Sequence, residues 1–139
     1  MTNFENKLVG ILNKDLEMGI ALNALAHLSV GLGGSLKDPS LLRLDTYTDA
    51  DKNSYESISQ LPFIILRARS IDIEKTIKAA KENNIAHTAF LNTMTGETYR
   101  EQLERTAATP SKDLIYYGCV LFGPWEMITT LTKKFSLWK

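Results

Sequence analysis

The sequence predicts an α/β fold of three layers, with helices on both faces of a mixed, mostly parallel sheet of about four main strands. Two apolar runs without polar alternation, 8–12 and 63–66, are typical of strands that are buried on both faces. Segments with helical spacing alternate with strands along the rest of the chain, as in α/β proteins. Because 139 residues is the length of one domain, we expect residues 1–139 to share one core.

The N-terminal part predicts a central strand that leads directly into a long apolar helix. The strand is followed by Asn13-Lys14-Asp15, in which the carboxylate of Asp15 is a candidate N-cap for the helix. Apolar residues of the helix point in several directions around a 3.6-residue wheel, so we expect it to be buried on more than one side. Gly33-Gly34 supplies the left-handed exit with which many helices end.

The next part of the chain predicts surface structure. Residues 36–40 contain Asp38-Pro39 and predict a loop, and residues 42–48 alternate as a half-exposed or edge strand does. Residues 49–54 are polar and contain two aspartates, but they lack the glycine and the glutamate of a calcium-binding loop. We therefore predict a solvated loop here and no metal site.

The second half of the chain alternates strands and helices. Thr98 and Glu101 have the spacing of a capping box, and Tyr99, Leu103 and Ala107 form the expected buried line of the helix that follows. The expected elements are a strand at 63–66, a helix at 70–83, a strand at 85–91, a helix at 98–108, a strand at 114–122, a helix after Pro124 and a short strand at 135–137.

Charge and cysteine content disfavour several classes of protein. The 16 basic and 16 acidic residues leave no net charge, so the basic excess that drives nucleic-acid binding through phosphates is absent. The lone Cys119 lies in an apolar strand and predicts a buried structural thiol in a reducing, cytoplasmic setting. No run of about 18 apolar residues occurs, so we expect neither a signal peptide nor a membrane contact.

One polar pair stands out on the apolar helix. Asn23 and His27 are four residues apart and therefore share a helix face. An imidazole can act as an acid or a base near neutral pH, and an amide can orient a substrate or stabilise an oxyanion. The pair is the catalytic candidate of the sequence. A histidine that only satisfies its hydrogen bonds inside the core is the alternative interpretation.

Further candidates follow the ends of two predicted strands. Lys14 and Asp15 follow the first strand, and the polar loop with Asn92, Thr93 and Thr95 follows a later one. Since ligands of open α/β sheets bind beyond the carboxyl ends of the strands, we expect these residues to bind a ligand. Helix capping and turn chemistry are the alternative interpretations. The sequence has no phosphate-binding glycine loop and no serine nucleophile elbow, and it predicts no cofactor.

Several local strings resemble the type 2 peptidyl-tRNA hydrolase fold. They are Asp15-Leu16 after the first strand, Met18-Gly19 at the start of the helix and Phe122-Gly123-Pro124 before the last helix. Closer still, the chain resembles an uncharacterised bacterial family, the "domain of unknown function 2000" group, through NKDL at 13–16, ALNALAHL at 21–28, YTDAD at 47–51 and LTKKFSLWK at 131–139. The resemblance implies a peptidyl-tRNA hydrolase II-like domain with a pocket near the exit of the first strand.

The chain departs from the hydrolase pattern at the chemical positions. The resemblance implies lysines where Ile20 and Leu22 stand and a glutamine where Ala26 stands, and the Asp-Ala-Gly-Arg-Thr loop of the hydrolases corresponds to residues 92–96. An aliphatic side chain cannot hold a phosphate or polarise an ester carbonyl as an ammonium group does. The family mechanism of peptidyl-tRNA hydrolysis is therefore not expected.

Three functional hypotheses follow. The favoured one is a small-ligand-binding or regulatory domain whose ligand is a small molecule or a peptide. The second is a hydrolase of peptidyl-tRNA or of another acyl ester or amide that uses His27 and Asn23, with tRNA as a partner. The third is a structural dimerisation module, and we expect a homodimer in which aromatic residues cover either the core or a subunit interface: Trp125, Phe135 and Trp138.

Overall fold

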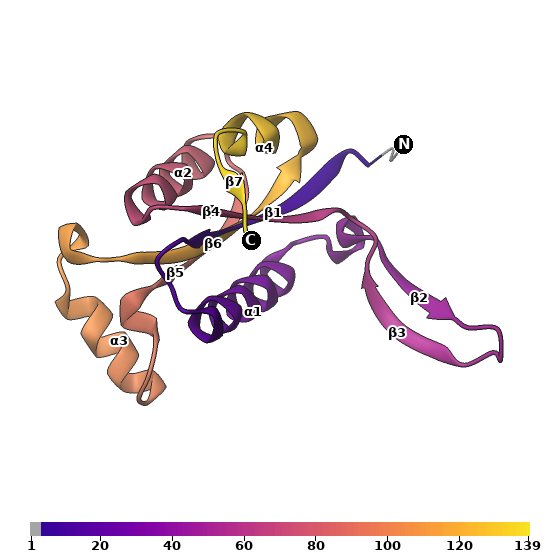
Figure 1. Cartoon of the computed structure of the whole chain (residues 1–139), viewed down its shortest axis with the longest axis horizontal. Coiled ribbons are helices and arrows are strands. Elements are labelled where there is room, and N and C mark those ends of the chain that lie inside the picture. The colour runs from indigo at the N-terminus through magenta and orange to yellow at the C-terminus, as the bar shows by residue number, and fades with distance from the viewer. Residues whose placement is uncertain (1–3) are drawn as a thin grey trace.

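The computed structural model describes residues 4–139 and shows a mixed sheet with helices on both faces (Figure 1). The sheet has five strands in the order β5-β6-β1-β4-β7, and a separate two-stranded hairpin is formed by β2 and β3. The strands are β1 (Asn6–Asn13), β2 (Leu44–Thr48), β3 (Ser54–Ser59), β4 (Phe63–Ala68), β5 (Ala86–Leu91), β6 (Tyr116–Pro124) and β7 (Ser136–Leu137). The α-helices are α1 (Met18–Ser35), α2 (Ser70–Glu82), α3 (Tyr99–Ala108) and α4 (Trp125–Thr132).

β1 is the central strand and contributes to a hydrophobic core on each face of the sheet. Val9 and Ile11 point toward α2 and α4, and Leu8 and Leu12 point toward α1. All four side chains are at most 3% exposed. This confirms the prediction, made from the unbroken apolar run, of a strand covered on both faces.

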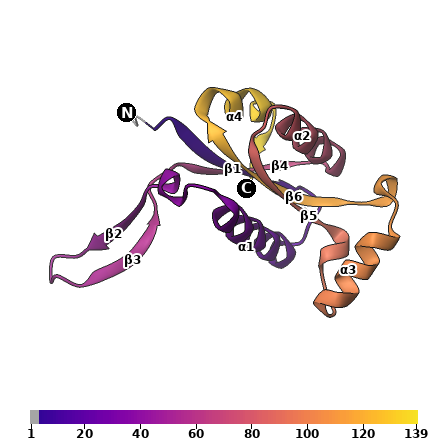
Figure 2. The same ribbon diagram turned by 180° about the vertical axis from the view of Figure 1, so that it is seen from behind.

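The expected predominance of parallel pairs is wrong. β1 is parallel to β4, but β1 and β6, β6 and β5, and β4 and β7 pair antiparallel. The reason lies in the path of the chain between β5 and β6. In residues 4–139, α3 packs on the short 3₁₀ helix η2 (Asn92–Met94) and lies beyond the edge of the sheet, so β6 returns antiparallel and separates β5 from β1 (Figures 1 and 2). The main sheet also has five strands where about four were expected.

α1 is buried along a single stripe, which corrects the expectation of burial on several sides. The buried stripe faces the sheet and consists of Ala21, Ala24, Leu28 and Leu32. Large apolar side chains on its other sides are between 40% and 77% exposed: Met18, Ile20, Leu22 and Val30. The chain that follows α1 turns away into the hairpin and does not cover them (Figure 1).

Both ends of α1 also differ from the prediction. The helix begins at Met18, and its N-cap residue Glu17 makes no side-chain capping bond. Asp15 therefore lies in the turn before the helix, where its backbone N–H donates to Oδ1 of Asn13 at 2.9 Å. Gly33 and Gly34 stay helical, the helix ends at Ser35, and the C-cap residue Leu36 has extended backbone.

The predicted strand at 42–48 exists as β2, but it pairs with β3 and not with the main sheet. The turn between them is organised by Asp49. Its carboxylate accepts from the backbone N–H groups of Asp51 and Asn53 and from the hydroxyl of Tyr55 at 2.7 Å. The bond from Tyr55 is the main reason that the pKa of Asp49 lies below its ordinary value. Within residues 4–139, no group of three or more His, Cys, Asp or Glu side chains could hold a metal ion.

Cys119 is fully buried in β6, and burial raises the pKa of its thiol to about 12. The thiol is therefore protonated at neutral pH and is no nucleophile in the folded state. Among the helices of residues 4–139, none has both the length and the apolar character that a membrane crossing requires.

The packing around Gly118 yields the first prediction. A Cβ atom on this residue of β6 would lie 2.9 Å from both the carbonyl oxygen of Ile11 and Cδ2 of Leu12. We expect Gly118→Ala to lower the free energy of unfolding by about 1–3 kcal/mol, because the contact with backbone cannot relax cheaply. Urea denaturation followed by circular dichroism measures the change.

Gly34→Ala is the control for this prediction. Gly34 lies in α1 with nothing within 4 Å of its added Cβ. We expect this variant to be as stable as the wild type or up to about 1 kcal/mol more stable, because alanine favours the helix. Equal unfolding free energies for Gly118→Ala and the wild type would contradict the packing described for β1 and β6.

Candidate functional site

A pocket with a volume of about 620 Å³ lies between α1, β5, the loop after β5 and α3. Pockets for small molecules commonly have volumes of about 300–1,000 Å³. Its apolar wall consists of Leu28, Gly31, Ala89, Phe90, Met94, Gly96 and Leu103. Its polar and amphipathic lining consists of Asn23, His27, Thr88, Thr95, Tyr99, Gln102 and Thr106.

α1 brings both catalytic candidates of the sequence to this pocket. Asn23 and His27 line it, and both are exposed to solvent. The imidazole ring of His27 lies 5.8 Å from the ring of Phe90, centroid to centroid. His27 is therefore not a sealed core histidine. Within the described residues 4–139, neither the Asn23 amide nor the His27 ring has a hydrogen-bond partner, so both are available to a ligand.

The wall formed by β5 is held at a fixed distance from α1. The hydroxyl of Thr88 donates to the carbonyl oxygen of Leu28 at 3.0 Å. Next to this bond, a Cβ atom on Gly31 would meet only the methyl group of Thr88, at 3.5 Å. The missing side chain of Gly31 thus leaves part of the pocket open, and a long side chain there would enter it.

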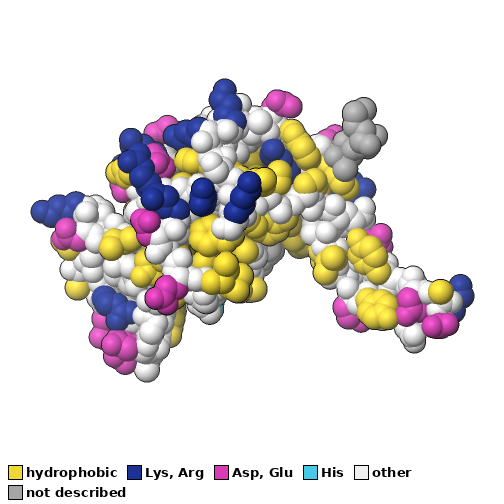
Figure 3. Space-filling view, viewed as in Figure 1, with side chains coloured by type: hydrophobic (Ala, Val, Ile, Leu, Met, Phe, Trp, Pro, Cys, Tyr) yellow, Lys and Arg dark blue, Asp and Glu magenta, His cyan; other side chains and the backbone are white. Residues whose placement is uncertain are grey.

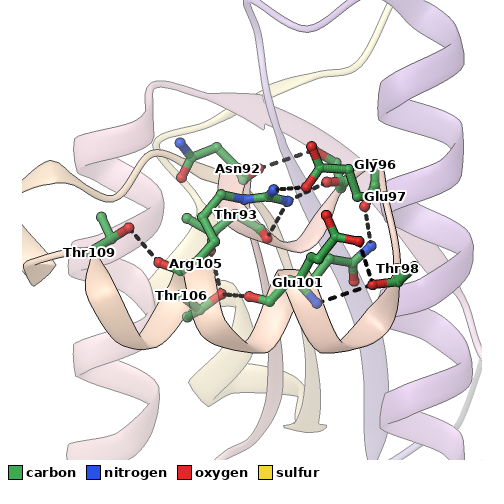
Figure 4. Close-up of polar contacts among 11 residues, drawn as sticks. Asn92, Thr93, Gly96, Glu97, Thr98, Glu101, Arg105, Thr106 and Thr109 are labelled. Atoms are coloured by element: carbon green, nitrogen blue, oxygen red, sulfur yellow. Dashed lines mark hydrogen bonds and ion pairs between the residues drawn. The ribbon is translucent and has the colours of Figure 1, made fainter.

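Arg105 holds the loop that closes the pocket toward α3 (Figure 4). Its guanidinium donates to the carbonyl oxygens of Thr93 at 3.0 Å and Thr95 at 2.6 Å, and it pairs with the carboxylate of Glu97 at 2.8 Å. Hydrogen bonds from a charged donor are stronger than neutral ones. The loop needs such support because Glu97 has a positive φ of 56°, which is unfavourable for a residue other than glycine.

The predicted capping box at the start of α3 is present. The hydroxyl of Thr98 accepts from the backbone N–H of Glu101 at 3.3 Å and donates to its carboxylate at 2.8 Å. The bond from the hydroxyl is the main cause that lowers the pKa of Glu101. α3 therefore begins at a defined residue, which places its first turn beside the pocket.

The loop candidates divide into one pocket residue and two structural ones. Thr95 lines the pocket, and its hydroxyl donates to the carbonyl oxygen of Asn92 at 3.0 Å. The side-chain oxygen of Asn92 accepts from the N–H of Ile115 at 3.0 Å. Thr93 is buried, and its hydroxyl is hydrogen-bonded to that of Thr106 at 2.8 Å. Neither Asn92 nor Thr93 lines the pocket, and both hold the loop in place.

Lys14 and Asp15 lie away from the pocket. Lys14 lines a shallow cleft with Arg67, Arg69 and Lys134 beyond the ends of β1 and β4, and its ammonium group lies 3.4 Å from the carboxylate of Asp15. The two groups of predicted ligand-binding residues are separated because β6 lies between β1 and β5. Two strand spacings place the ends of β1 and β5 about 10 Å apart.

The residues that α3 contributes were interpreted as core in the sequence. Tyr99 and Leu103 form an apolar line, but they are 74% and 53% exposed and border the pocket together with Gln102. The amide of Gln102 donates to the carbonyl oxygen of Gly96 at 2.7 Å, which leaves its side-chain oxygen free to accept. No local signal distinguishes an apolar line that faces a pocket from one that faces a core.

Comparison with known proteins places the chain in a family but assigns no activity. A family model described as "Protein of unknown function (DUF2000)" matches residues 6–139. The solved structure of a protein of unknown function from Agrobacterium tumefaciens superposes with a TM-score of 0.81. The two chains are 21% identical, over 98% of this chain and 99% of that one, so the likeness shows the fold alone. No curated protein sequence matches.

The role of Arg105 yields the second prediction. Arg105→Ala removes two charge-assisted hydrogen bonds and one ion pair from the pocket loop. We expect local opening of residues 92–104 to become easier by about 1–2 kcal/mol, which raises amide hydrogen exchange roughly 5- to 30-fold. Hydrogen exchange with peptide-level mass spectrometry measures the rate.

Arg100→Ala is the matched control, because Arg100 lies in the same helix and is exposed. We expect its exchange rates to equal those of the wild type. Equal exchange in the Arg105 and Arg100 variants would show that Arg105 does not hold the loop.

Proposed function

The chain belongs to the DUF2000 family of proteins of unknown function, and we propose that it is a small-ligand-binding or regulatory protein whose ligand occupies the pocket between α1, β5 and α3. The observation that supports this proposal most directly is the composition of the pocket. It combines a largely apolar wall with two polar side chains, Asn23 and His27, that point to no protein partner within residues 4–139. Such a combination is typical of sites that bury the body of a small molecule and orient it by a few polar contacts.

The lining also indicates the chemical class of the ligand. No Lys, Arg, Asp or Glu side chain lines the pocket within the described residues. A charged group buried here would lose its hydration without gaining a counter-ion. The favoured ligand is therefore an uncharged molecule with an apolar or aromatic body that lies against Phe90 and Leu103. A polar end would meet the Asn23 amide and the His27 imidazole.

We further propose that residues 1–139 form one domain of the type 2 peptidyl-tRNA hydrolase-like superfamily, in a cytoplasmic protein. The positions of the resembling strings support this: Asp15-Leu16 follows β1, Met18-Gly19 begins α1, and Phe122-Gly123-Pro124 ends β6. Where the resemblance implies lysines, Ile20 and Leu22 present apolar side chains that are 40% and 57% exposed. This surface offers no cation for a tRNA phosphate, which favours ligand binding over the chemistry of those hydrolases.

A hydrolase is the second candidate, because His27 and Asn23 do share one pocket. Its nucleophile would be water. The hydroxyls of Thr88, Thr95 and Thr106 all donate to backbone carbonyl oxygens. In residues 4–139 no carboxylate orients the His27 ring, whereas histidine bases in nucleophilic catalysis are usually oriented by a third group. The pocket thus supports binding better than catalysis.

Blocking the pocket tests the binding proposal. We expect ligand-observed NMR with a library of uncharged aromatic and aliphatic fragments to detect binders to the wild type. Gly31→Leu should abolish their binding, because the new side chain enters the pocket. Asn23→Ala should weaken those that carry a polar end about five- to tenfold, the loss expected for one hydrogen bond.

Gly34→Leu is the control, since it introduces the same side chain into the same helix at a position with nothing within 4 Å of its Cβ. This variant should keep the binders. Fragments that bind the wild type, Gly31→Leu and Gly34→Leu equally, or a library without any binder, would contradict the proposed ligand site.

The hydrolase candidate has its own test. We expect hydrolysis of p-nitrophenyl acetate and of a model peptidyl-tRNA to be the same for the wild type, for His27→Ala and for the control His87→Ala. His87 is the second histidine, and its ring bonds to the carbonyl oxygen of Ile85 at 2.8 Å outside the pocket. A loss of kcat/KM of about 100-fold or more in His27→Ala alone would establish general acid–base catalysis by this residue.

A further inference from the structure

Two surfaces outside the pocket are apolar and uncovered, and the first of them lies on the hairpin. We name residues 44–59, which comprise β2, β3 and their turn, the arm. The arm extends away from the sheet at the end of the molecule opposite α3 (Figures 1 and 2). All residues of β2 and β3 are exposed except Ser59, which is half-buried. A two-stranded hairpin without further packing is only marginally stable in water.

One face of the two strands carries the large apolar and aromatic side chains of the arm and no charged side chain of either strand. Alternate residues of a strand share a face, so Tyr55, Ser57 and Ser59 lie together. Tyr47 is paired with Tyr55 and Leu44 with Ser59, which places both on this same face. Leu44, Tyr47 and Tyr55 are 53–56% exposed. The acidic groups of the strands, Asp45 and Glu56, fall on the opposite face together with Ile58.

The outer side of α1 is the second uncovered apolar surface. None of the 18 residues of α1 carries a charge, which is unusual for a helix with one side in water. Met18, Leu22, Ala26 and Val30 follow one another at intervals of four and form a ridge along the helix. Met18, Leu22 and Val30 are 56%, 57% and 77% exposed.

The two surfaces fit each other in length. An α-helix rises about 1.5 Å per residue, so the ridge from Met18 to Val30 spans about 18 Å. A strand rises about 3.3 Å per residue, so the five residues of β2 span about 16 Å. Figure 3 shows a notch between the arm and the body of the molecule, with hydrophobic side chains gathered on both sides of it.

We propose that the arm of one copy of this chain lies along the outer ridge of α1 in a second copy, and that the second arm returns the contact. In such a two-fold pair each chain supplies the same two surfaces, and both arms and both ridges are covered at once. The partner is therefore a second copy of the chain, held by arm exchange.

The exposed area agrees with this partner. The six large side chains of the arm face and the ridge are each more than half exposed: Met18, Leu22, Val30, Leu44, Tyr47 and Tyr55. At about 100 Å² each they contribute roughly 600 Å² per copy, close to the 800 Å² that each partner of a standard interface buries.

Charge favours a protein partner over a membrane. The arm carries Asp45, Asp49, Asp51 and Glu56 against the single Lys52, which would repel an anionic lipid surface.

Sedimentation equilibrium of the full chain at micromolar concentration tests the proposal. We expect the wild type to dimerise, and we expect Leu22→Glu and Tyr47→Glu each to raise the dimer Kd by about 100-fold, because each places a charge in an apolar contact. Ile58→Glu is the matched control: Ile58 is 62% exposed on the other face of the arm and should leave the Kd unchanged. Circular dichroism verifies folding, and Val30→Glu replaces Leu22→Glu should the latter unfold.

Mixing the two disrupted variants distinguishes arm exchange from other dimers. The arm of Leu22→Glu and the α1 ridge of Tyr47→Glu are both intact, so one of the two contacts can form in the mixed pair. We expect the mixture to dimerise more tightly than either variant alone. A ridge-to-ridge dimer would be disrupted by Leu22→Glu only and would overturn the assignment.

Two further outcomes would also overturn it. One is a wild type that stays monomeric at 100 µM, roughly a hundredfold above the micromolar Kd at the weak end of the range for an interface of standard size. The other is binding of the monomer, through the same residues, to vesicles of phosphatidylcholine and phosphatidylglycerol.

Discussion

The structure depends on the pairing of β1 along both of its edges. β4 pairs with it in parallel from Leu8 to Asn13, and β6 pairs antiparallel from Asn6 to Leu12. With both edges and both faces covered, every residue of the strand except the half-buried Asn6 is buried, and its side chains supply the middle of each core. Its last residue extends this role to the loops, since the Asn13 amide donates to the carbonyl oxygen of Tyr116 at 3.0 Å. The pairing of β1 with β6 also brings Gly118 so close to Ile11 that no side chain fits between them.

The packing of α1 against this central strand also explains why the sides of the helix differ in what they contact. Small residues, Ala21 and Ala24, let the helix lie close to β1 and β6, and Leu28 and Leu32 complete that contact. No other element of residues 4–139 covers the opposite side of the helix along its length. Asn23 and His27 lie on the flank toward α3, where Arg105 keeps the loop in place. One helix thus serves the core, the pocket and an open apolar ridge.

The sequence could predict those features that depend on neighbouring residues, and it could not predict those that depend on distant elements. The burial of β1 was predictable because the unbroken apolar run 8–12 is interpreted without knowledge of its neighbours. The similar run 63–66 predicted the strand β4 but not its burial, since Phe63 is exposed and Ile64 and Ile65 are half-buried. The direction of β6 was not predictable, because it depends on where α3 lies. The position of α3 could not be predicted either, since a helix has the same apolar line whether it faces a sheet or a pocket. The shared pocket of Asn23, His27 and Thr95 was anticipated in part. Lys14 and Asp15 were misplaced because an intervening strand cannot be read from order along the chain.

The apolar character of α1 also shows that a local sequence pattern does not identify the surface that covers it. Hydrophobic residues all around a helix predict burial on all sides, but sequence does not state whether the covering surface belongs to the same chain. Here Met18, Leu22 and Val30 remain exposed in a single copy, and the proposed arm exchange rests on this exposure. Since the same rigid helix carries the pocket residues Asn23 and His27, a ligand and a second chain would act on one element. Any ligand that binds the single chain and the pair with unequal affinity must then shift their equilibrium by that same ratio.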